Sequence, residues 1–385
     1  MISASRSPLP YRACVSRGSV VFAETNRAIR IDRPDAAPQL WVPRPDVVSA
    51  ALAAATPGSW HEGEGDLSGH VVFDHDEFDI SITDGRTGDD PGDVTTKRFP
   101  NWGDSADLVD VLDVRADAEG RFVSQPRSDW RRPVVEGSQM LAQTIVAASR
   151  LAPDRRTVSA SMVFTRAVDA RAPYAIELEQ LSGGRTFSAL QARANQDDRI
   201  CAAGTVLLDV TAPDLISHCE GPPEVAGPYD AVPYDMSVTG RDLRIVDGAY
   251  TGDPGAPVGP PELDAWVRFR TLPDDPLLHV ALMAQFTGHM SIAAALRPHA
   301  DFGQDQAHRT LSTAINAISL SVHRPIRADH WMLYHHRSTS AAAGMTHSEC
   351  RVFDSEGSFL ASFTVDAMVR AFADPSKSAN ARTAL

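Results

Sequence analysis

The sequence predicts an α+β protein in which a helix enclosed by antiparallel strands occurs twice, behind a small and mostly β domain. A helical pattern at 137–149 is followed by long strand patterns at 157–210. The same order returns at 276–296 and 311–372, which indicates an internal duplication. Short alternating runs fill the first 92 residues and are typical of strands separated by turns.

The front of the chain is expected to form one small β domain over residues 1–92. Runs such as Ser19–Ala23 and Gly69–Phe78 alternate apolar and polar residues between turn-forming positions. A stretch rich in Gly, Asp and Thr follows and cannot bury much apolar area. We therefore expect a linker at 93–105.

The first repeated unit is expected at 106–211. Its helix, Gly137–Ser149, carries small or apolar residues on nearly every side, which suits a helix surrounded by sheet. Pro153 is expected to end it. The predicted strands are Thr157–Arg166, Tyr174–Leu181, Thr186–Ala194 and Ile200–Val210.

Residues 212–262 are crowded with Pro and Gly, so we interpret them as a connection between the two units. The second unit is expected at 263–373, followed by a tail at 374–385. Its predicted elements are a strand at Ala265–Phe269, a helix at Pro276–Leu296 and strands at Leu311–Val322, His330–Arg337, His347–Phe353 and Phe359–Phe372. The two units can pair edge to edge into one sheet around two helices, which covers strand edges.

Composition limits the classes of function. The chain has 385 residues, 43% of them hydrophobic, and a formal net charge of -14, which disfavours nucleic acid as a partner. No apolar run has the length of a signal peptide or a membrane span, so we expect a cytoplasmic protein. No zinc site or disulfide framework is indicated, because the cysteines lack paired spacing: Cys14, Cys201, Cys219 and Cys350. We expect no cofactor.

Several strings in the repeated part resemble one family in their order along the chain. They are Val135–Gln139 with Gln143, Val163–Ala167, Gly184–Ser188, Trp266–Arg268, Pro273–Asp275, Leu296–His299 and His323–Tyr334. Over about 106–372 the chain resembles the type II acyl-CoA thioesterases, whose fold is a double hotdog, two helices each wrapped by antiparallel sheet. In the front domain, Thr25–Ala28 and Trp41–Val47 resemble a small bacterial β-domain family without an assigned function, of which this domain is an abridged form.

The resemblance implies a set of catalytic positions at which this chain differs. The family uses an Asp on the helix of the second unit, a Thr on the following strand and a Gln on the last strand. When the family's positions are aligned with this chain without gaps, they fall on Gly288, Ile315 and Val365. We expect all three residues to line the substrate site. None of these side chains can order a water molecule for hydrolysis.

A replacement site is expected at the start of the first helix. Glu136 stands directly before it, where a carboxylate can act as a general base while the amides of Gly137 and Ser138 face a carbonyl oxygen. Gln139 is a further candidate. The alternative interpretation is structural, with Glu136 capping the helix and Gln139 hydrogen-bonded to a neighbouring strand.

Two polar residues near the altered family positions complete the candidate catalytic set, His289 and Asn316. A lone histidine in an apolar helix is also compatible with a core residue whose hydrogen bonds are satisfied. His335, His336 and His347 have no neighbouring carboxylates or cysteines in a pattern that indicates a metal.

Three functions remain open at this point. The first is an acyl-CoA thioesterase-like protein that binds, and hydrolyses, fatty acyl or related thioesters on coenzyme A or an acyl carrier protein, with the acyl chain between the two units. The second is a non-hydrolytic acyl-thioester binding protein, or a non-hydrolytic hotdog enzyme of a secondary-metabolite pathway. The third is a scaffold whose front domain recruits a partner. Hotdog units commonly assemble further, so we expect a homo-oligomer.

Overall fold

The computed structural model describes residues 5–9, 12–33, 36–84, 95–100, 102–127, 134–234, 239–250, 255–308 and 310–372. The chain divides into two compact units, one of residues 1–103 with 235–240 and one of residues 104–234 with 241–385. The expected tail at 374–385 lies outside the described residues, as do positions 93, 94 and 101 of the expected linker.

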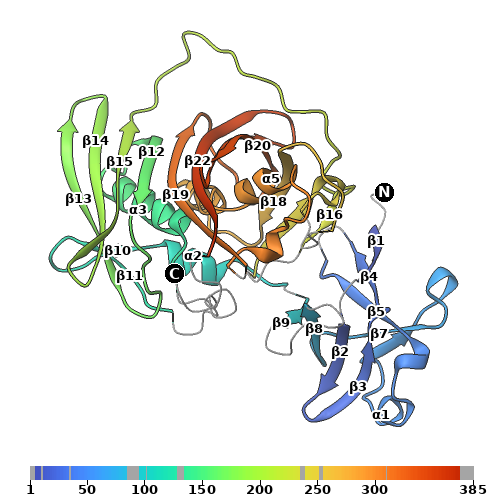
Figure 1. The fold of residues 1–385 in the computed structure, drawn as a ribbon. Coiled ribbons are helices and arrows are strands. Elements are labelled where there is room, and N and C mark those ends of the chain that lie inside the picture. Colours follow the sequence, from blue (N-terminus) through green and yellow to red (C-terminus); the bar gives the residue numbers. More distant parts are fainter. Residues whose placement is uncertain are drawn as a thin grey trace. The chain divides into compact units, whose positions relative to one another are not determined.

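The first unit contains two antiparallel sheets and is mostly β, as the sequence predicts (Figure 1). Three phenylalanines, Phe22, Phe73 and Phe78, meet edge to face in its core. The five-stranded sheet has the order β1 (Ser5–Pro8), β4 (Ile29–Asp32), β5 (Gln39–Pro43), β7 (His70–Phe73) and β6 (Trp60–Glu62). The four-stranded sheet has the order β3 (Val20–Thr25), β2 (Arg12–Arg17), β8 (Asp79–Asp84) and β9 (Thr95–Phe99). Short helices are α1 (Ser49–Ala53), η1 (Arg44–Asp46) and η2 (Gly65–Leu67).

The second unit is built on one antiparallel sheet of 13 strands. In sheet order, the strands of its first lobe are β10 (Arg115–Ala116), β11 (Phe122–Ser124), β13 (Tyr174–Gly183), β14 (Phe187–Gln196), β15 (Arg199–Asp209) and β12 (Arg156–Phe164). The strands of its second lobe continue as β19 (Leu311–Val322), β22 (Phe359–Ala371), β21 (Met345–Asp354), β20 (Met332–Ala342), β18 (Glu262–Phe269), β17 (Arg241–Ile245) and β16 (Val232–Pro233).

The two lobes join edge to edge where β12 pairs with β19, in the register Ser159 to Ser321. The sheet curves around α3 in one lobe and around α5 in the other (Figure 1). Neither lobe is left with an open edge at this seam, which is the physical advantage of the arrangement. The double hotdog prediction is confirmed.

Helix α3 (Gly137–Leu151) is the central helix of the first lobe, and every residue from Ser138 to Ser149 is buried. Its mostly small and apolar side chains allow this enclosure, because no charged group has to be dehydrated. A second helix, α2 (Ala106–Leu112), lies where the sequence shows only a short apolar run.

The prediction of a single helix at Pro276–Leu296 is wrong, because this stretch forms two helices, α4 (Pro276–Phe286) and α5 (Ser291–Leu296). The break falls at Thr287–Met290, where Met290 has a φ of 69°. By length and composition alone this stretch could cross a membrane, but 72% of its most apolar window is buried within the fold. The break brings Gly288 and His289 to a helix end.

The segment 212–262, which shows little periodicity in the sequence, contains β16, β17 and the 3-10 helix η3 (Val246–Gly248). β17 pairs with β18 and so extends the sheet of the second lobe, and Arg241 is its first residue. A final 3-10 helix, η4 (Gln304–Gln306), precedes β19. The sequence did not reveal these strands, because they are short and give few alternations of apolar and polar residues, and because proline and glycine interrupt the pattern between them.

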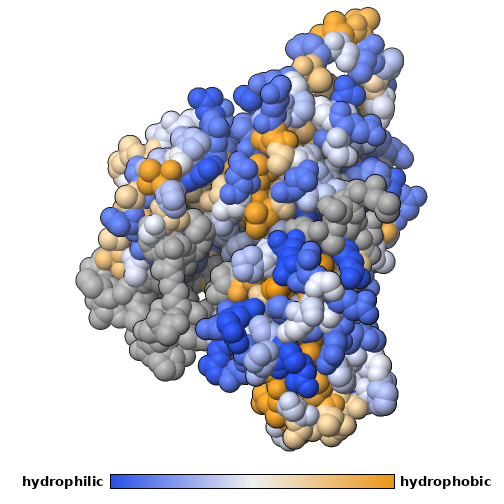
Figure 2. All heavy atoms as spheres, turned by 90° about the vertical axis from the view of Figure 1, so that its right-hand side faces the viewer, coloured by the Kyte–Doolittle hydropathy of each residue, from blue (hydrophilic) through white to orange (hydrophobic). Residues whose placement is uncertain are grey.

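The surface drawn in Figure 2 is a mosaic in which hydrophobic residues form separate groups among hydrophilic ones. Single exposed apolar residues are normal on a folded protein. The most exposed pair is Leu215 and Ile216, at 98% and 80%, in the long segment that links β15 to β16 (Figure 1).

Candidate functional site

The start of α3 is fixed by a short antiparallel pairing with the segment that follows β12. The amide of Val135 donates to the carbonyl of Val168 at 3.0 Å, and Val134 forms an isolated bridge with Asp169. Gly137 packs on the ring of Phe164, where an added Cβ would approach ring atoms to 2.8 Å. A larger residue at position 137 would therefore require the ring of Phe164 to move.

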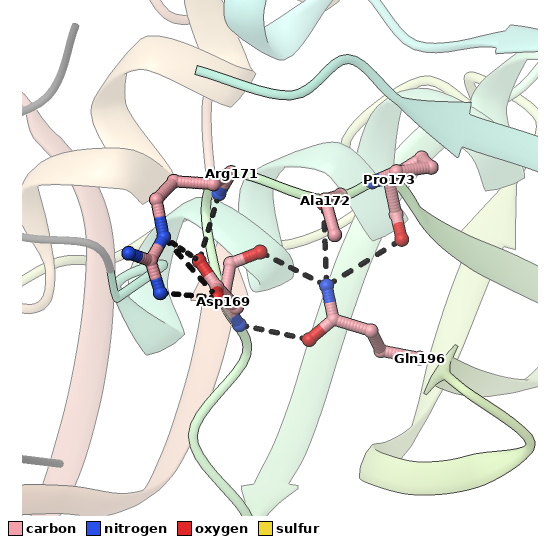
Figure 3. A network of polar contacts seen from close by, with 5 residues as sticks. All are labelled: Asp169, Arg171, Ala172, Pro173 and Gln196. Carbon is pink, nitrogen blue, oxygen red and sulfur yellow. Dashed lines mark hydrogen bonds and ion pairs between the residues drawn. The ribbon is translucent and has the colours of Figure 1, made fainter. Parts of the chain in front are cut away.

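Gln196, at the end of β14, holds that segment in place (Figure 3). Its Oε1 accepts from the amide of Asp169 at 2.8 Å, and its Nε2 donates to the carbonyl oxygens of Asp169 at 2.9 Å and Ala172 at 3.2 Å. Hydrogen bonds from Arg171 lower the pKa of the exposed Asp169 carboxyl to about 2. The network fixes the backbone against which Val134 and Val135 lie, and so the position of the next residue, Glu136.

Glu136 occupies the N-cap position of α3, but its side chain makes no capping hydrogen bond. Its carboxylate instead turns toward the second lobe, where Oε2 accepts from Gln285 Nε2 at 3.3 Å and lies 3.5 Å from His289 Nε2. The Glu136 side chain is 46% exposed, whereas that of His289 is only 11% exposed. The carboxylate thus stays open to solvent on one side and is held by the second lobe on the other.

His289 is a neutral group in this site. Burial lowers the pKa of its imidazole to about 4, against the opposing effect of the Glu136 charge. His289 Nε2 lies 3.4 Å from Arg241 Nη1 and 3.5 Å from Glu136 Oε2, so the tautomer of the neutral ring decides which of the two contacts is a hydrogen bond. The contact between His289 and Glu136 is therefore not an ion pair at neutral pH.

Arg241 supplies the positive charge of the site. Burial lowers the pKa of its guanidinium to about 10, which still leaves it charged at neutral pH. Its Nη1 donates to Gln285 Oε1 at 3.2 Å, and the guanidinium lies over the ring of Phe286 at 5.2 Å. The Gln285 amide therefore bridges Arg241 and Glu136: its oxygen accepts from Arg241 and its nitrogen donates to Glu136. These two hydrogen bonds fix the orientation of the amide and of the carboxylate.

The first amides of α3 lie beside Glu136. Among the described residues, the N–H groups of Gly137 and Ser138 meet no acceptor, while those of Gln139 and Met140 donate to the carbonyl of Glu136 at 3.1 and 3.2 Å. Free amides at the start of a long helix carry partial positive charge and suit an oxyanion. That the Glu136 carboxylate and these two amides act on one carbonyl group stays a prediction.

Gly288 lies against Ser138, so one of the altered family positions meets the start of α3, and Ile315 lies near Gly288. A Cβ on Gly288 would come within 2.4 Å of Ser138 Oγ and 2.9 Å of Ser138 Cβ. The same Cβ would lie 3.5 Å from Ile315 Cδ1. Position 288 therefore has no room for a carboxylate while Ser138 keeps its place.

The other predicted residues lie apart from this cluster or at its edge. Gln139 is buried and lies close to Tyr174 on β13, whose hydroxyl donates to Gln143. Asn316 sits at a bulge in β19, and its buried Oδ1 has no hydrogen-bond partner among the described residues. Val365, 1% exposed, pairs with Ser348 on β21, whose hydroxyl donates to the carbonyl of Ser291 at the start of α5. It therefore faces the helix layer but has no contact that shows it in the site.

Sequence reasoning missed Gln285 and Arg241. Gln285 precedes His289 by four residues, a spacing that places two helical side chains on one face and could have identified it. No comparable signal marks Arg241, which comes from β17, the strand next to the edge strand β16. Within the described parts of the chain, no three His, Cys, Asp or Glu side chains are grouped to hold a metal ion.

Two protein-family models match the sequence of the second unit. Residues 126–208 match the family model of the acyl-CoA thioesterase N-terminal domain, and residues 217–369 match that of the C-terminal domain. The double hotdog of this chain belongs to the acyl-CoA thioesterase family. The resemblance predicted from the sequence is confirmed.

Individual members of the family are distant. Acyl-CoA thioesterase 2 of Haemophilus influenzae is 26% identical over 257 residues, covering 61% of this chain and 87% of that protein. Human acyl-coenzyme A thioesterase 8 is 25% identical over 273 residues, covering 61% and 80%. The solved structure of the TesB protein of Mycobacterium avium subsp. paratuberculosis superposes with a TM-score of 0.59, at 24% identity, over 69% of this chain and 99% of that one.

Proposed function

We propose that this protein binds acyl-CoA or a related acyl thioester and hydrolyses it at the start of α3. The observation that carries the proposal is the meeting of the Glu136 carboxylate with the second-lobe residues Gln285 and His289, beside the unused amides of Gly137 and Ser138. Family membership supports the thioester as ligand, and we place its acyl chain between the two lobes.

In this mechanism Glu136 is the general base. Its exposed oxygen can hold a water molecule, while the other oxygen is fixed by Gln285. The water gives its proton to Glu136 and attacks the thioester carbon, and the amides of Gly137 and Ser138 stabilise the oxyanion. When the carbon–sulfur bond breaks, the proton returns from Glu136 to the sulfur. His289, neutral at this pH, limits the hydration of the carboxylate.

Thiol release from a panel of acyl-CoA chain lengths tests the proposal. Cys219 is exposed and would react with a disulfide reagent, so the assay uses a Cys219→Ser background. Glu136→Gln should lower kcat by about 100-fold or more, because it removes the base while keeping the side-chain size. Glu179→Gln, which changes a glutamate that is 64% exposed on β13, is the matched control. Normal turnover by Glu136→Gln would refute the role of Glu136.

A second candidate is a protein that binds acyl thioesters without hydrolysing them. It is favoured by Gly288, Ile315 and Val365, none of which can order a water molecule at the positions where the family carries its polar residues. Tight binding of acyl-CoA, measured by calorimetry, without thiol release would support it. Absence of both binding and release would favour a scaffold in which the front domain recruits a partner.

The setting of the protein is part of the same proposal. All four cysteines are free, which fits the reducing cytoplasm. We also expect a homo-oligomer, because hotdog lobes commonly assemble, and sedimentation velocity of the full chain measures this directly.

A further inference from the structure

The Ser138 hydroxyl is a buried polar group without a partner. Ser138 is 0% exposed, and its Oγ forms no hydrogen bond in the described structure. A hydroxyl can donate one hydrogen bond, and buried polar groups in folded proteins are almost always paired. A group left unpaired in this way is expected to meet its partner in a bound ligand or water.

The Ser138 hydroxyl packs against a residue that has no side chain. Oγ lies over Gly288, so closely that a Cβ on that residue would come within 2.4 Å of it. The apolar Cδ1 of Ile315 would lie 3.5 Å from the same Cβ position. The hydroxyl can occupy its position because residue 288 lacks a side chain, and no described residue accepts its proton.

The hydroxyl stands at the amino end of α3, a helix of 15 residues. The backbone amide of the same residue and that of Gly137 also lack acceptors among the described residues. Two consecutive residues thus present three donors, and the helix dipole adds partial positive charge at this end. Donors grouped in this way, in a largely dry site, stabilise a developing negative charge strongly.

We propose that Ser138 donates its hydroxyl proton in a hydrogen bond to the carbonyl oxygen of the bound thioester, as a catalytic residue of the reaction proposed above. This inference rests on the proposed function. When water adds to the thioester carbon, the carbonyl electron pair moves onto the oxygen, and Ser138 stabilises that oxyanion while keeping its own proton. The proton of the water still goes to Glu136 and then to the leaving sulfur.

Two non-hydrolysable coenzyme A analogues of equal chain length test this role by binding alone. One is a 2-oxoalkyl thioether, which carries a ketone oxygen, and the other is a plain alkyl thioether, which carries none. Ser138→Ala should weaken binding of the oxo analogue by about tenfold and leave the alkyl thioether unchanged, since only the first offers an acceptor. If the protein hydrolyses acyl-CoA, the variant should also lower kcat by about 100-fold, because the hydrogen bond strengthens as the oxyanion forms.

Two further variants keep the test decisive. Ser138→Cys keeps the shape of the side chain in a somewhat larger form with a weak donor, and should bind the oxo analogue as weakly as Ser138→Ala does if the hydrogen bond is what matters. Ser149→Ala, in the last turn of the same helix, removes another buried hydroxyl and should bind both analogues normally. Melting temperatures of all three variants show whether each is folded.

The outcomes separate this inference from the proposed function. Equal affinity of wild type and Ser138→Ala for the oxo analogue would overturn the role of Ser138, even if thiol release continues. Equal weakening of both analogues would also overturn it, because it would show a change of pocket shape. If wild type binds neither analogue, the proposed function itself fails, and the inference fails with it.

Discussion

The substitution Gly288→Ala tests how closely the two lobes pack against each other at the candidate site. The new Cβ would lie 2.4 Å from Ser138 Oγ and 2.9 Å from Ser138 Cβ. Rotation of the hydroxyl relieves the first contact but not the second, which involves an atom fixed to the backbone of α3. One helix end must therefore move within a close-packed interior, and we expect a loss of about 2 kcal/mol of unfolding free energy.

Urea denaturation of wild type, Gly288→Ala, Ser138→Gly and the double variant forms a double-mutant cycle. Removing the Ser138 side chain takes away both contacting atoms, so the double variant should recover most of the stability that Gly288→Ala loses. The expected coupling is about 1–2 kcal/mol. Additive effects of the two substitutions, or a Gly288→Ala protein as stable as wild type, would refute the packing argument. A Gly288→Asp protein that folds normally without a change at Ser138 would refute it as well.

Other features give further predictions. Burial lowers the pKa of His289 to about 4 and that of His336 to about 3, so the unfolded chain binds more protons than the folded one from pH 6.5 down to these values. Stability should therefore fall as pH drops through this window, by about 1.4 kcal/mol per pH unit for each histidine, and urea unfolding of wild type and His289→Gln at pH 7 and pH 5 measures the difference. Native protein should react rapidly with a disulfide reagent at the exposed Cys219 and not at Cys350, whose pKa is raised by burial; fast labelling of Cys350 in a peptide map would contradict the fold. Gln196→Ala should lower the free energy of unfolding by about 1–3 kcal/mol and reduce turnover, because the backbone that supports Glu136 loses its hydrogen bonds. Gln191→Ala, on the same strand, is the control and should change neither stability nor turnover.

The sequence determined those parts of the fold that depend on local pattern. The strand Leu311–Val322 and the start of α3 at Gly137 agree with the sequence predictions, because long alternations and an uninterrupted small-residue run leave little ambiguity. The duplication and the family strings likewise led to the double hotdog, and Glu136 was recognised by its place at a helix start.

Tertiary structure alone decided how the candidate site is assembled. The break between α4 and α5 depends on the left-handed backbone conformation of Met290, which the apolar pattern of that stretch does not reveal. Arg241 reaches the site from a short strand that is recognisable only through its pairing with β18. The carboxylate of Glu136 meets residues about 150 positions later in the chain, and such a contact depends on how two lobes pack, which no local pattern encodes.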